Sequence, residues 1–184
     1  GGNDGSAMNR PGAGYNTSSS KSTLTINGGT IYVNAAGDGL DANGSIYMNG
    51  GYVTVDGPSN SGNGALDYDS EFKITGGTLI AAGAGGMSQG ISSSSTQYGV
   101  LINFASSYPS ETVITIIDSN NNELMSYTSS KSFSSVVFSS SKLSKGTYTI
   151  KVNGNTEQTF TISNISSTVG NSSMGGKNNP GGRR

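Results

Sequence analysis

The chain has 184 residues, of which 29 are glycine and 11% are charged, and its formal net charge is −1. A charge this close to zero argues against nucleic acid or an anionic membrane surface as the main partner. No run of about 20 apolar residues is present, so the sequence predicts no membrane span. Cysteine, histidine and tryptophan are absent, which excludes disulfides, thiolate or imidazole metal sites and a Ser-His-Asp triad.

The chain begins with a segment of low complexity. Residues 1–22 are rich in Gly, Asn and Ser and contain almost no apolar residues, which predicts a flexible loop or tail. The sequence starts Gly1-Gly2 and shows no signal peptide. We therefore expect a mature or clipped fragment whose upstream part is missing.

One pattern then occurs three times, over residues 24–33, 46–55 and 72–81. Each copy has two short apolar-alternating runs separated by Gly-Gly, and the glycine pairs are 22 and then 26 residues apart (28 to 50, 50 to 76). A period in this range indicates a solenoid, in which each repeat buries its apolar face by stacking on its neighbours. The apolar residues show no 3.6-residue periodicity across the glycines, so the pattern argues against a helix.

Each repeat predicts a strand, a sharp corner and a second strand. Alternating apolar and polar residues are typical of half-buried strands, and Gly-Gly supplies the backbone freedom that a corner needs. We therefore predict an all-β fold, a parallel β-helix of about three coils over residues 23–97. The coils would run over 23–44, 45–70 and 71–97, and a small antiparallel β cap would follow.

The alignment of the repeats predicts which side chains stack. The inward columns are Leu24/Ile46/Phe72, Ile26/Met48/Ile74, Ile31/Val53/Leu79 and Val33/Val55/Ala81. The outward columns are Thr25/Tyr47/Lys73 and Thr30/Tyr52/Thr78, and Asn27/Asn49/Thr75 would form a polar ladder beside the corner. The loop over residues 56–62 gives coil two its four extra residues and is predicted to be a surface excursion.

A second motif recurs on the back of the coils. Residues 37–43 (GDGLDAN) align with 63–69 (NGALDYD), so that Asp41 and Asp67 are separated by 26 residues, like the second pair of corners. Coil three offers Gly-Gly-Met-Ser-Gln (85–89) at this place. We expect Leu40, Leu66 and Met87 to point inward.

Stacked acids need compensation. Adjacent coils lie about 4.8 Å apart, and two carboxylates at about 5 Å repel by roughly 1 kcal/mol in water and more in a protein. Oxygen ligands without nitrogen or sulfur favour Ca²⁺. We therefore predict a calcium site whose ligands are Asp38, Asp41, Asn43, Asn63, Asp67 and Asp69. The alternative is that these residues only form turns, bonding their own backbone.

From Tyr98 the repeat ends and hairpins are predicted. A strand is expected at 100–104. A first hairpin would join 113–117 to 124–127, a short strand covers 136–138, and a second hairpin would join 148–152 to 159–162. This block, residues 98–163, would cap the open end of the coils. Residues 164–184 return to Asn, Ser, Gly and Pro, and we expect a flexible tail.

Several of these runs resemble a known family. Gly-Asp-Gly-Leu-Asp-Ala-Asn-Gly (37–44), Asn-Gly-Gly (27–29 and 49–51), the run 57–69 and Thr-Gly-Gly-Thr-Leu-Ile-Ala-Ala-Gly (75–83) resemble the carbohydrate-binding-domain-containing family of bacterial surface β-helix proteins. The resemblance extends to 131–137. It implies a right-handed parallel β-helix with a polysaccharide-lyase-like fold, Ca²⁺ between coils and affinity for cellulose or pectin.

The function favoured by the sequence is a non-catalytic polysaccharide-binding module, secreted or on the surface of a bacterium. Its expected partner is cellulose or a polygalacturonate-like chain, and the tyrosines at outward or turn positions, Tyr32, Tyr47, Tyr52 and Tyr68, are the candidates for stacking on sugar rings. The alternative, which is favoured for any single one of them, is that tyrosine simply suits a pleated surface.

Two alternative functions stay open at this point. A calcium-dependent polysaccharide lyase needs a strong base beside the metal, and Lys73 is the one basic residue in the repeat region. A subunit of an extracellular fibre or matrix would associate end to end through an open coil end.

Overall fold

The structure is a computed structural model that describes residues 22–170, and all of its regular structure in this range is β-strand. The low-complexity segment predicted over 1–22 lies almost entirely outside the described residues, as does the tail from 171 onward. The first eight strands come from the repeated region: β1 (Thr23–Ile26), β2 (Thr30–Asn34), β3 (Leu40–Ala42), β4 (Ser45–Met48), β5 (Tyr52–Asp56), β6 (Leu66–Tyr68), β7 (Glu71–Ile74) and β8 (Thr78–Gly83).

Seven further strands follow the repeats. They are β9 (Gly99–Tyr108), β10 (Val113–Asp118), β11 (Glu123–Thr128), β12 (Phe133–Ser140), β13 (Gly146–Val152), β14 (Asn155–Ile162) and β15 (Ser166–Val169). The two predicted hairpins are confirmed, since β10 pairs antiparallel with β11 and β13 with β14. The chain then continues into β15, which lies within the stretch that was predicted to be a tail.

The repeated strands pair in the predicted register. Leu24 is opposite Ile46 and Ile46 is opposite Phe72 in the parallel sheet β1-β4-β7. The second strands of the repeats, β2, β5 and β8, are also parallel neighbours. The corners between them stack as well, and the second glycine of each pair has a positive φ, at Gly29, Gly51 and Gly77. The repeat period therefore fixes the register, because every equivalent residue meets its own copy.

The polar ladder beside the corners is also present. The side chain of Asn49 donates from Nδ2 to Oδ1 of Asn27 at 2.9 Å, and it accepts at Oδ1 from the hydroxyl of Thr75 at 2.8 Å. These bonds join the three repeats on the exposed side of the corner, where the backbone turns away from the core.

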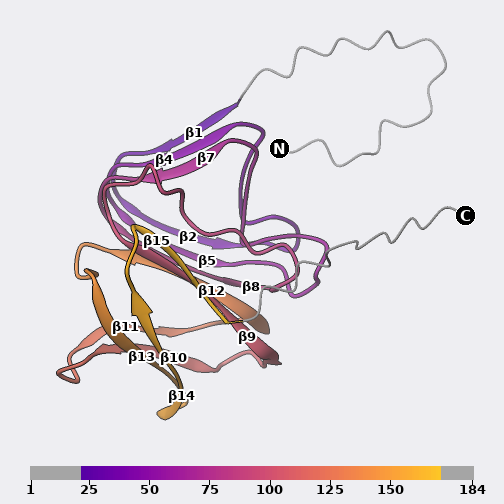
Figure 1. The fold of residues 1–184 in the computed structure, drawn as a ribbon. Helices are drawn as coiled ribbons and strands as arrows, with labels where there is room; N and C mark the ends of the chain where they lie inside the picture. Colours follow the sequence, from indigo (N-terminus) through magenta and orange to yellow (C-terminus); the bar gives the residue numbers. More distant parts are fainter. Residues whose placement is uncertain (1–21, 171–184) are drawn as a thin grey trace, which may run out of the picture.

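The strands form three layers with two cores between them (Figure 1). The sheet β1-β4-β7 packs on one face of a six-stranded sheet, with Ile46, Met48, Phe72 and Leu79 completely buried between them. The antiparallel sheet β11-β10-β13-β14 packs on the other face of the six-stranded sheet through a second apolar cluster, which includes Phe138 and Ile116. The central sheet is thus buried on both faces over most of its width.

The predicted parallel β-helix with a separate antiparallel cap is wrong. The central sheet has the order β15-β9-β12-β8-β5-β2, so three strands of the repeats share it with two strands from the predicted cap and with β15 from the predicted tail. Strand β8 pairs with β12 in antiparallel orientation, β12 pairs antiparallel with β9, and β9 pairs parallel with β15. The fold is therefore a set of short sheets with mixed orientations, because the edge of β8 is completed by an antiparallel strand.

The second motif, over residues 37–43 and 63–69, forms a strand in each of the first two repeats. Leu40 and Leu66 are buried as predicted, in the parallel pair β3-β6. The expectation that Met87 points inward is wrong, since its side chain is 52% exposed. Residues 85–90 add no third strand. Instead the side chain of Gln89 accepts from the backbone N–H of Tyr68 and donates to its carbonyl, which completes the edge of β6.

Candidate functional site

The four candidate tyrosines lie at three different places. Tyr32 on β2 and Tyr52 on β5 are 58% and 45% exposed, and both point away from the core between β1-β4-β7 and the central sheet. Tyr47 lies on β4, in the opposite sheet, and its hydroxyl donates to Glu71. Tyr68 on β6 is largely buried and its hydroxyl donates to the carbonyl of Gly90 at 2.7 Å.

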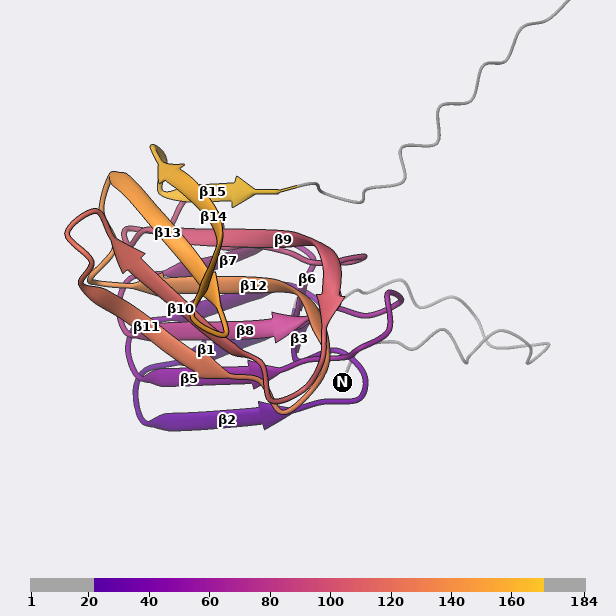
Figure 2. The same cartoon turned by 90° about the horizontal axis from the view of Figure 1, so that it is seen from below.

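Tyr32 and Tyr52 are exposed because the antiparallel sheet does not reach the edge of the central sheet. Figure 2 shows β10, β11 and β13 crossing over β8, β12 and β9, while β2 at the edge is uncovered. Tyr52 is opposite Thr30 and Tyr32 is opposite Thr54 in the β2-β5 pair, so the two rings lie diagonally on neighbouring strands. They present two large aromatic side chains to solvent on the same face of neighbouring strands.

A hollow of about 230 Å³ adjoins Tyr52, where β11 passes over the central sheet. Its polar lining side chains are Thr78, Glu123, Ser126, Ser140 and Lys142. We call Tyr32, Tyr52 and this hollow the tyrosine face. It combines exposed aromatic rings with hydroxyl groups and one charge of each sign, which are the groups that contact the CH faces and hydroxyls of sugars.

A buried carboxylate holds the tyrosine face together. Asp56 at the end of β5 is only 1% exposed. It accepts hydrogen bonds from the hydroxyls of Tyr32 at 2.9 Å and Tyr127 at 2.7 Å. The hydroxyls of Ser129 and Ser130 and the backbone N–H of Ser130 also donate to it. Asp56 therefore joins β2 and β5 of the repeats to the segment that follows β11.

These donors determine the protonation of the cluster. Burial by itself would raise the pKa of Asp56, but the hydrogen bonds from Ser130, Tyr127 and Tyr32 outweigh it and the pKa lies below its ordinary value of 3.8. The pKa of Tyr127 is strongly raised, by burial first and then by its bond to the Asp56 carboxylate. The cluster is thus an ionised aspartate surrounded by neutral donors at neutral pH.

The sequence placed Asp56 in a surface loop, and the structure buries it at a strand end. Its column, Asn34/Asp56/Ala82, is outward in the repeats, so an exposed side chain was the natural expectation. The donors Tyr127, Ser129 and Ser130 lie 71 to 74 residues further along the chain. No local pattern signals a contact over that separation.

The acidic column predicted on the back of the repeats exists in part. Asp41 and Asp67 are opposite each other in the β3-β6 pair, as the spacing predicted. The pKa of Asp67 is raised, chiefly by burial and then by the neighbouring carboxylates of Asp38, Asp41 and Asp69. The backbone N–H of Gly64 donates to Asp38 Oδ1 at 2.8 Å, so this bond joins two repeats and is not the local turn considered as the alternative.

The remaining predicted metal ligands are more scattered. Asn63 donates to Asn60 Oδ1 within its own loop. Asn43 is exposed and lies with Asp41 beside a cavity of about 230 Å³ at the β1 end of the stack, whereas Asp69 is exposed beyond β6.

The acidic side chains do not form a calcium shell by themselves. No group of three or more acidic residues in the described range 22–170 is arranged to hold a metal ion, and Ca²⁺ takes six to eight oxygens. An ion at the Asp41–Asp67 pair would need most of its oxygens from backbone carbonyls and water. The calcium site stays a prediction.

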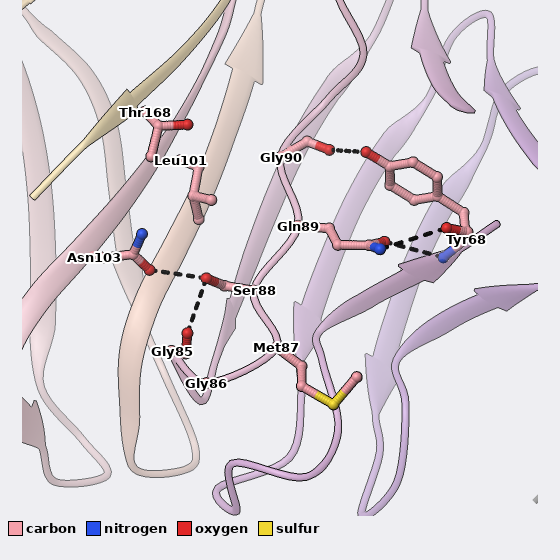
Figure 3. Close-up of a pocket in the computed structure, with 10 residues that line it drawn as sticks. All are labelled: Tyr68, Gly85, Gly86, Met87, Ser88, Gln89, Gly90, Leu101, Asn103 and Thr168. Carbon is pink, nitrogen blue, oxygen red and sulfur yellow. Dashed lines mark hydrogen bonds between the residues drawn. The ribbon is translucent and has the colours of Figure 1, made fainter. Parts of the chain in front are cut away.

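A larger pocket lies on another side of the molecule, and we call it the Asn103 pocket (Figure 3). It has a volume of about 600 Å³ and lies between the 85–90 segment, β9 and β15. The lining residues are Tyr68, Gly85, Gly86, Met87, Ser88, Gln89, Gly90, Leu101, Asn103 and Thr168. Tyr68 is one of the sugar-binding candidates predicted from the sequence, and the other lining residues are not among them.

No helix within residues 22–170 is long and apolar enough to cross a membrane. Comparison with known proteins gives one positive finding. No curated protein and no solved structure matches the chain. Residues 12–102, which contain Tyr32, Tyr52 and Tyr68, match the family model described as carbohydrate-binding domain-containing protein, and this supports the family resemblance over that part of the chain.

Proposed function

We propose that the chain is a non-catalytic module that binds a polysaccharide of the plant-wall type through the tyrosine face. The observation that carries the proposal is the pair of exposed rings, Tyr32 and Tyr52, on adjacent strands beside a hollow lined by hydroxyl groups. The match to a carbohydrate-binding family supports it independently, because that match includes both strands.

The ring of Tyr32 is held in place before any ligand arrives. Its hydroxyl donates to the buried Asp56 carboxylate and lies 3.2 Å from the Ser130 hydroxyl, while most of the ring faces solvent. A side chain already fixed in its binding orientation loses little conformational entropy when a sugar stacks on it. The Asp56 cluster therefore positions the ring without contacting the ligand.

Binding without catalysis is consistent with the groups on this face. Glycoside hydrolysis generally uses two carboxyl groups on opposite sides of the scissile bond. The hollow is lined by one carboxylate, Glu123. The other nearby carboxylate, Asp56, is buried and fully engaged with hydroxyl and backbone donors.

A pull-down on insoluble polysaccharide tests this proposal. The full chain is mixed with cellulose or with insoluble pectate, and the bound fraction is measured over a range of protein concentrations. The double variant Tyr32→Ala/Tyr52→Ala removes both rings, and we expect its affinity to fall by about tenfold or more. Tyr52→Phe keeps the stacking ring and should retain most of the affinity.

Tyr47→Ala is the matched control, because Tyr47 is an outward tyrosine of the same repeats in the opposite sheet. It should bind like the unmodified chain. Equal binding by the double variant and by Tyr47→Ala would contradict the assignment of the tyrosine face. Failure of the unmodified chain to bind either polysaccharide would contradict the function itself.

A fibre subunit is less well supported. End-to-end growth needs open strands at both ends of the repeat stack. At the β7 end, however, the backbone N–H groups of Phe72 and Ile74 already donate hydrogen bonds to the hydroxyls of Ser92 and Ser95. Strand β8 is likewise paired with β12.

A further inference from the structure

The Asn103 pocket contains a buried donor with no partner. Asn103 on β9 is 4% exposed, and its amide nitrogen Nδ2 has no hydrogen-bond partner among the described residues. The amide oxygen is 2.9 Å from the Ser88 hydroxyl, which also lies 3.1 Å from the carbonyl of Gly85. Figure 3 shows the oxygen turned toward Ser88 and the nitrogen turned away from it. An unpaired buried amide group costs about 1–3 kcal/mol, so it calls for a partner.

A hydroxyl group is the partner that suits this amide best. A hydroxyl both donates and accepts, so it pairs with whichever end of the Asn103 amide faces the pocket. The other end of the amide then stays bonded to Ser88. If that end is the nitrogen, it donates to the Ser88 hydroxyl, which in turn donates to the carbonyl of Gly85. A ligand rich in hydroxyls therefore supplies the kind of partner that this amide lacks.

The rest of the pocket offers apolar contact. Leu101, the ring of Tyr68 and the side chain of Met87 lie around the cavity, and Met87 is one of the few large apolar side chains left exposed. The Tyr68 ring is fixed through its hydroxyl on Gly90, and Gln89 is engaged with the backbone of β6. These bonds hold both side chains in their present positions, and apolar surface of this kind packs on the CH face of a sugar ring.

The pocket carries no charge. None of its lining residues is Asp, Glu, Lys or Arg. A carboxylate entering it would lose hydration without gaining an ion pair. The hollow of the tyrosine face differs in this respect, because Lys142 lies at its wall.

From these observations we propose that the Asn103 pocket binds a neutral sugar unit, with a sugar hydroxyl on the Asn103 amide and the ring against Met87 and Leu101. The inference rests on the proposed function, since it specifies a sugar class within it. It predicts that the pocket distinguishes a neutral glucan from a polyuronate. The volume of about 600 Å³ is within the usual range for small-ligand sites.

Titration of the full chain with soluble disaccharides tests the proposal. Cellobiose is the neutral probe and digalacturonate the anionic probe, and binding is followed by the amide NMR spectrum. The titration is repeated in the Tyr32→Ala/Tyr52→Ala background, which removes any contribution of the tyrosine face. We expect cellobiose to shift the resonances of residues 85–90 and 101–103 in both backgrounds, and digalacturonate to bind at least tenfold more weakly.

Two variants separate binding from folding. Asn103→Leu removes the amide and should weaken cellobiose about tenfold, whereas thermal stability should hardly fall because an unpaired donor is lost with it. Met87→Ala truncates an exposed side chain and should weaken cellobiose severalfold while the chain stays folded. Val113→Ala is the matched control, since Val113 is also exposed and apolar but lies on β10.

The outcomes are distinct from those of the pull-down. If cellobiose shifts no resonance around the pocket, the proposal is overturned even when the chain still binds insoluble polysaccharide through its tyrosines. Equal affinity for digalacturonate, or an effect of Met87→Ala no larger than that of Val113→Ala, also overturns it. If the unmodified chain binds neither insoluble polysaccharide while cellobiose still shifts the pocket resonances, the proposed function of the tyrosine face is contradicted and the pocket proposal stands.

Discussion

The repeated region, residues 23–83, and the antiparallel region, residues 99–162, meet in one sheet but are built in opposite ways. In the repeats, each strand lies parallel to its own copy, and the corners are glycine pairs that stack on each other. In the antiparallel region, the pairs β10-β11 and β13-β14 are hairpins, and the turn of the first, Asp118 to Asn122, faces solvent. A strand of the repeats pairs with a strand of the next repeat, whereas each strand of a hairpin pairs with the strand next to it in the sequence.

This difference explains how the two regions tolerate change. A corner in the middle of the stack has backbone directly above or below it, so there is no room for an added atom. A hairpin turn has only solvent around it. The two regions therefore respond differently to the same substitution.

The largest effect is expected at the corner of the third repeat, which lies directly against the corner of the second. Gly77 has φ of +93°, and a Cβ there would lie 2.6 Å from the carbonyl oxygen of Gly51. Gly77→Ala should cost about 4 kcal/mol or prevent folding, because backbone strain adds to a clash with backbone. Gly29→Ala is the control, since Gly29 has a similar φ of +88° but nothing within 4 Å of its Cβ position. It should cost only about 1 kcal/mol.

Thermal or urea unfolding of both variants measures the contrast. Equal losses of stability at Gly29 and Gly77 would show that φ alone matters and that the stacking of corners does not.

The next largest effect is expected at the joint between the regions. Asp56→Ala leaves the hydroxyl of Tyr127 and the backbone N–H of Ser130 without their acceptor and should cost about 3 kcal/mol in unfolding free energy. Asp118→Ala removes a carboxylate that also accepts several hydrogen bonds, but in an exposed hairpin turn. Its effect should be much smaller. A comparable loss at both positions would contradict the role of Asp56 as the joint.

Acid should weaken the same joint. The pKa of Asp56 is below its ordinary value of 3.8 in the folded chain, because the hydrogen bonds outweigh burial. Its stabilising contribution is therefore complete above pH 3.8 and is lost as the pH falls through the lower, folded value. Unfolding followed from pH 6 downward should show a loss below about pH 4 that Asp56→Asn lacks. The same slope in both chains would assign the acid sensitivity to other carboxyl groups.

The smallest effect is expected in the acidic column. The pKa of Asp67 is raised by burial and by Asp38, Asp41 and Asp69, so its ionised form destabilises the fold above that pKa and the penalty disappears as the pH falls through it. In the presence of a chelator at pH 7, Asp67→Asn should gain about 0.5 kcal/mol. If the predicted calcium ion binds here, added calcium should raise the melting temperature of the unmodified chain and not that of the variant. An equal response of both chains to calcium would contradict the calcium prediction.

The sequence by itself determined the register of the repeated strands, the position of their corners and the hairpins. Equivalent residues such as Ile46 and Phe72 meet because copies of one pattern stack in register, and Gly51 and Gly77 take positive φ because the corner demands it. The hairpins follow from short apolar runs around turn residues. The pairing of Asp41 with Asp67 follows from the same period.

Only the tertiary structure decided how the repeats end and which side chains become functional candidates. The antiparallel pairing of β8 with β12 gives a mixed central sheet in place of a parallel β-helix, and the 85–90 segment leaves Met87 exposed beside a pocket. Asp56 is buried by residues more than 70 positions away, and Asn103 lies between segments from three parts of the chain. These contacts depend on which surfaces remain uncovered after the local elements form. A periodic pattern carries no information about that, because it relates a residue only to its own copies.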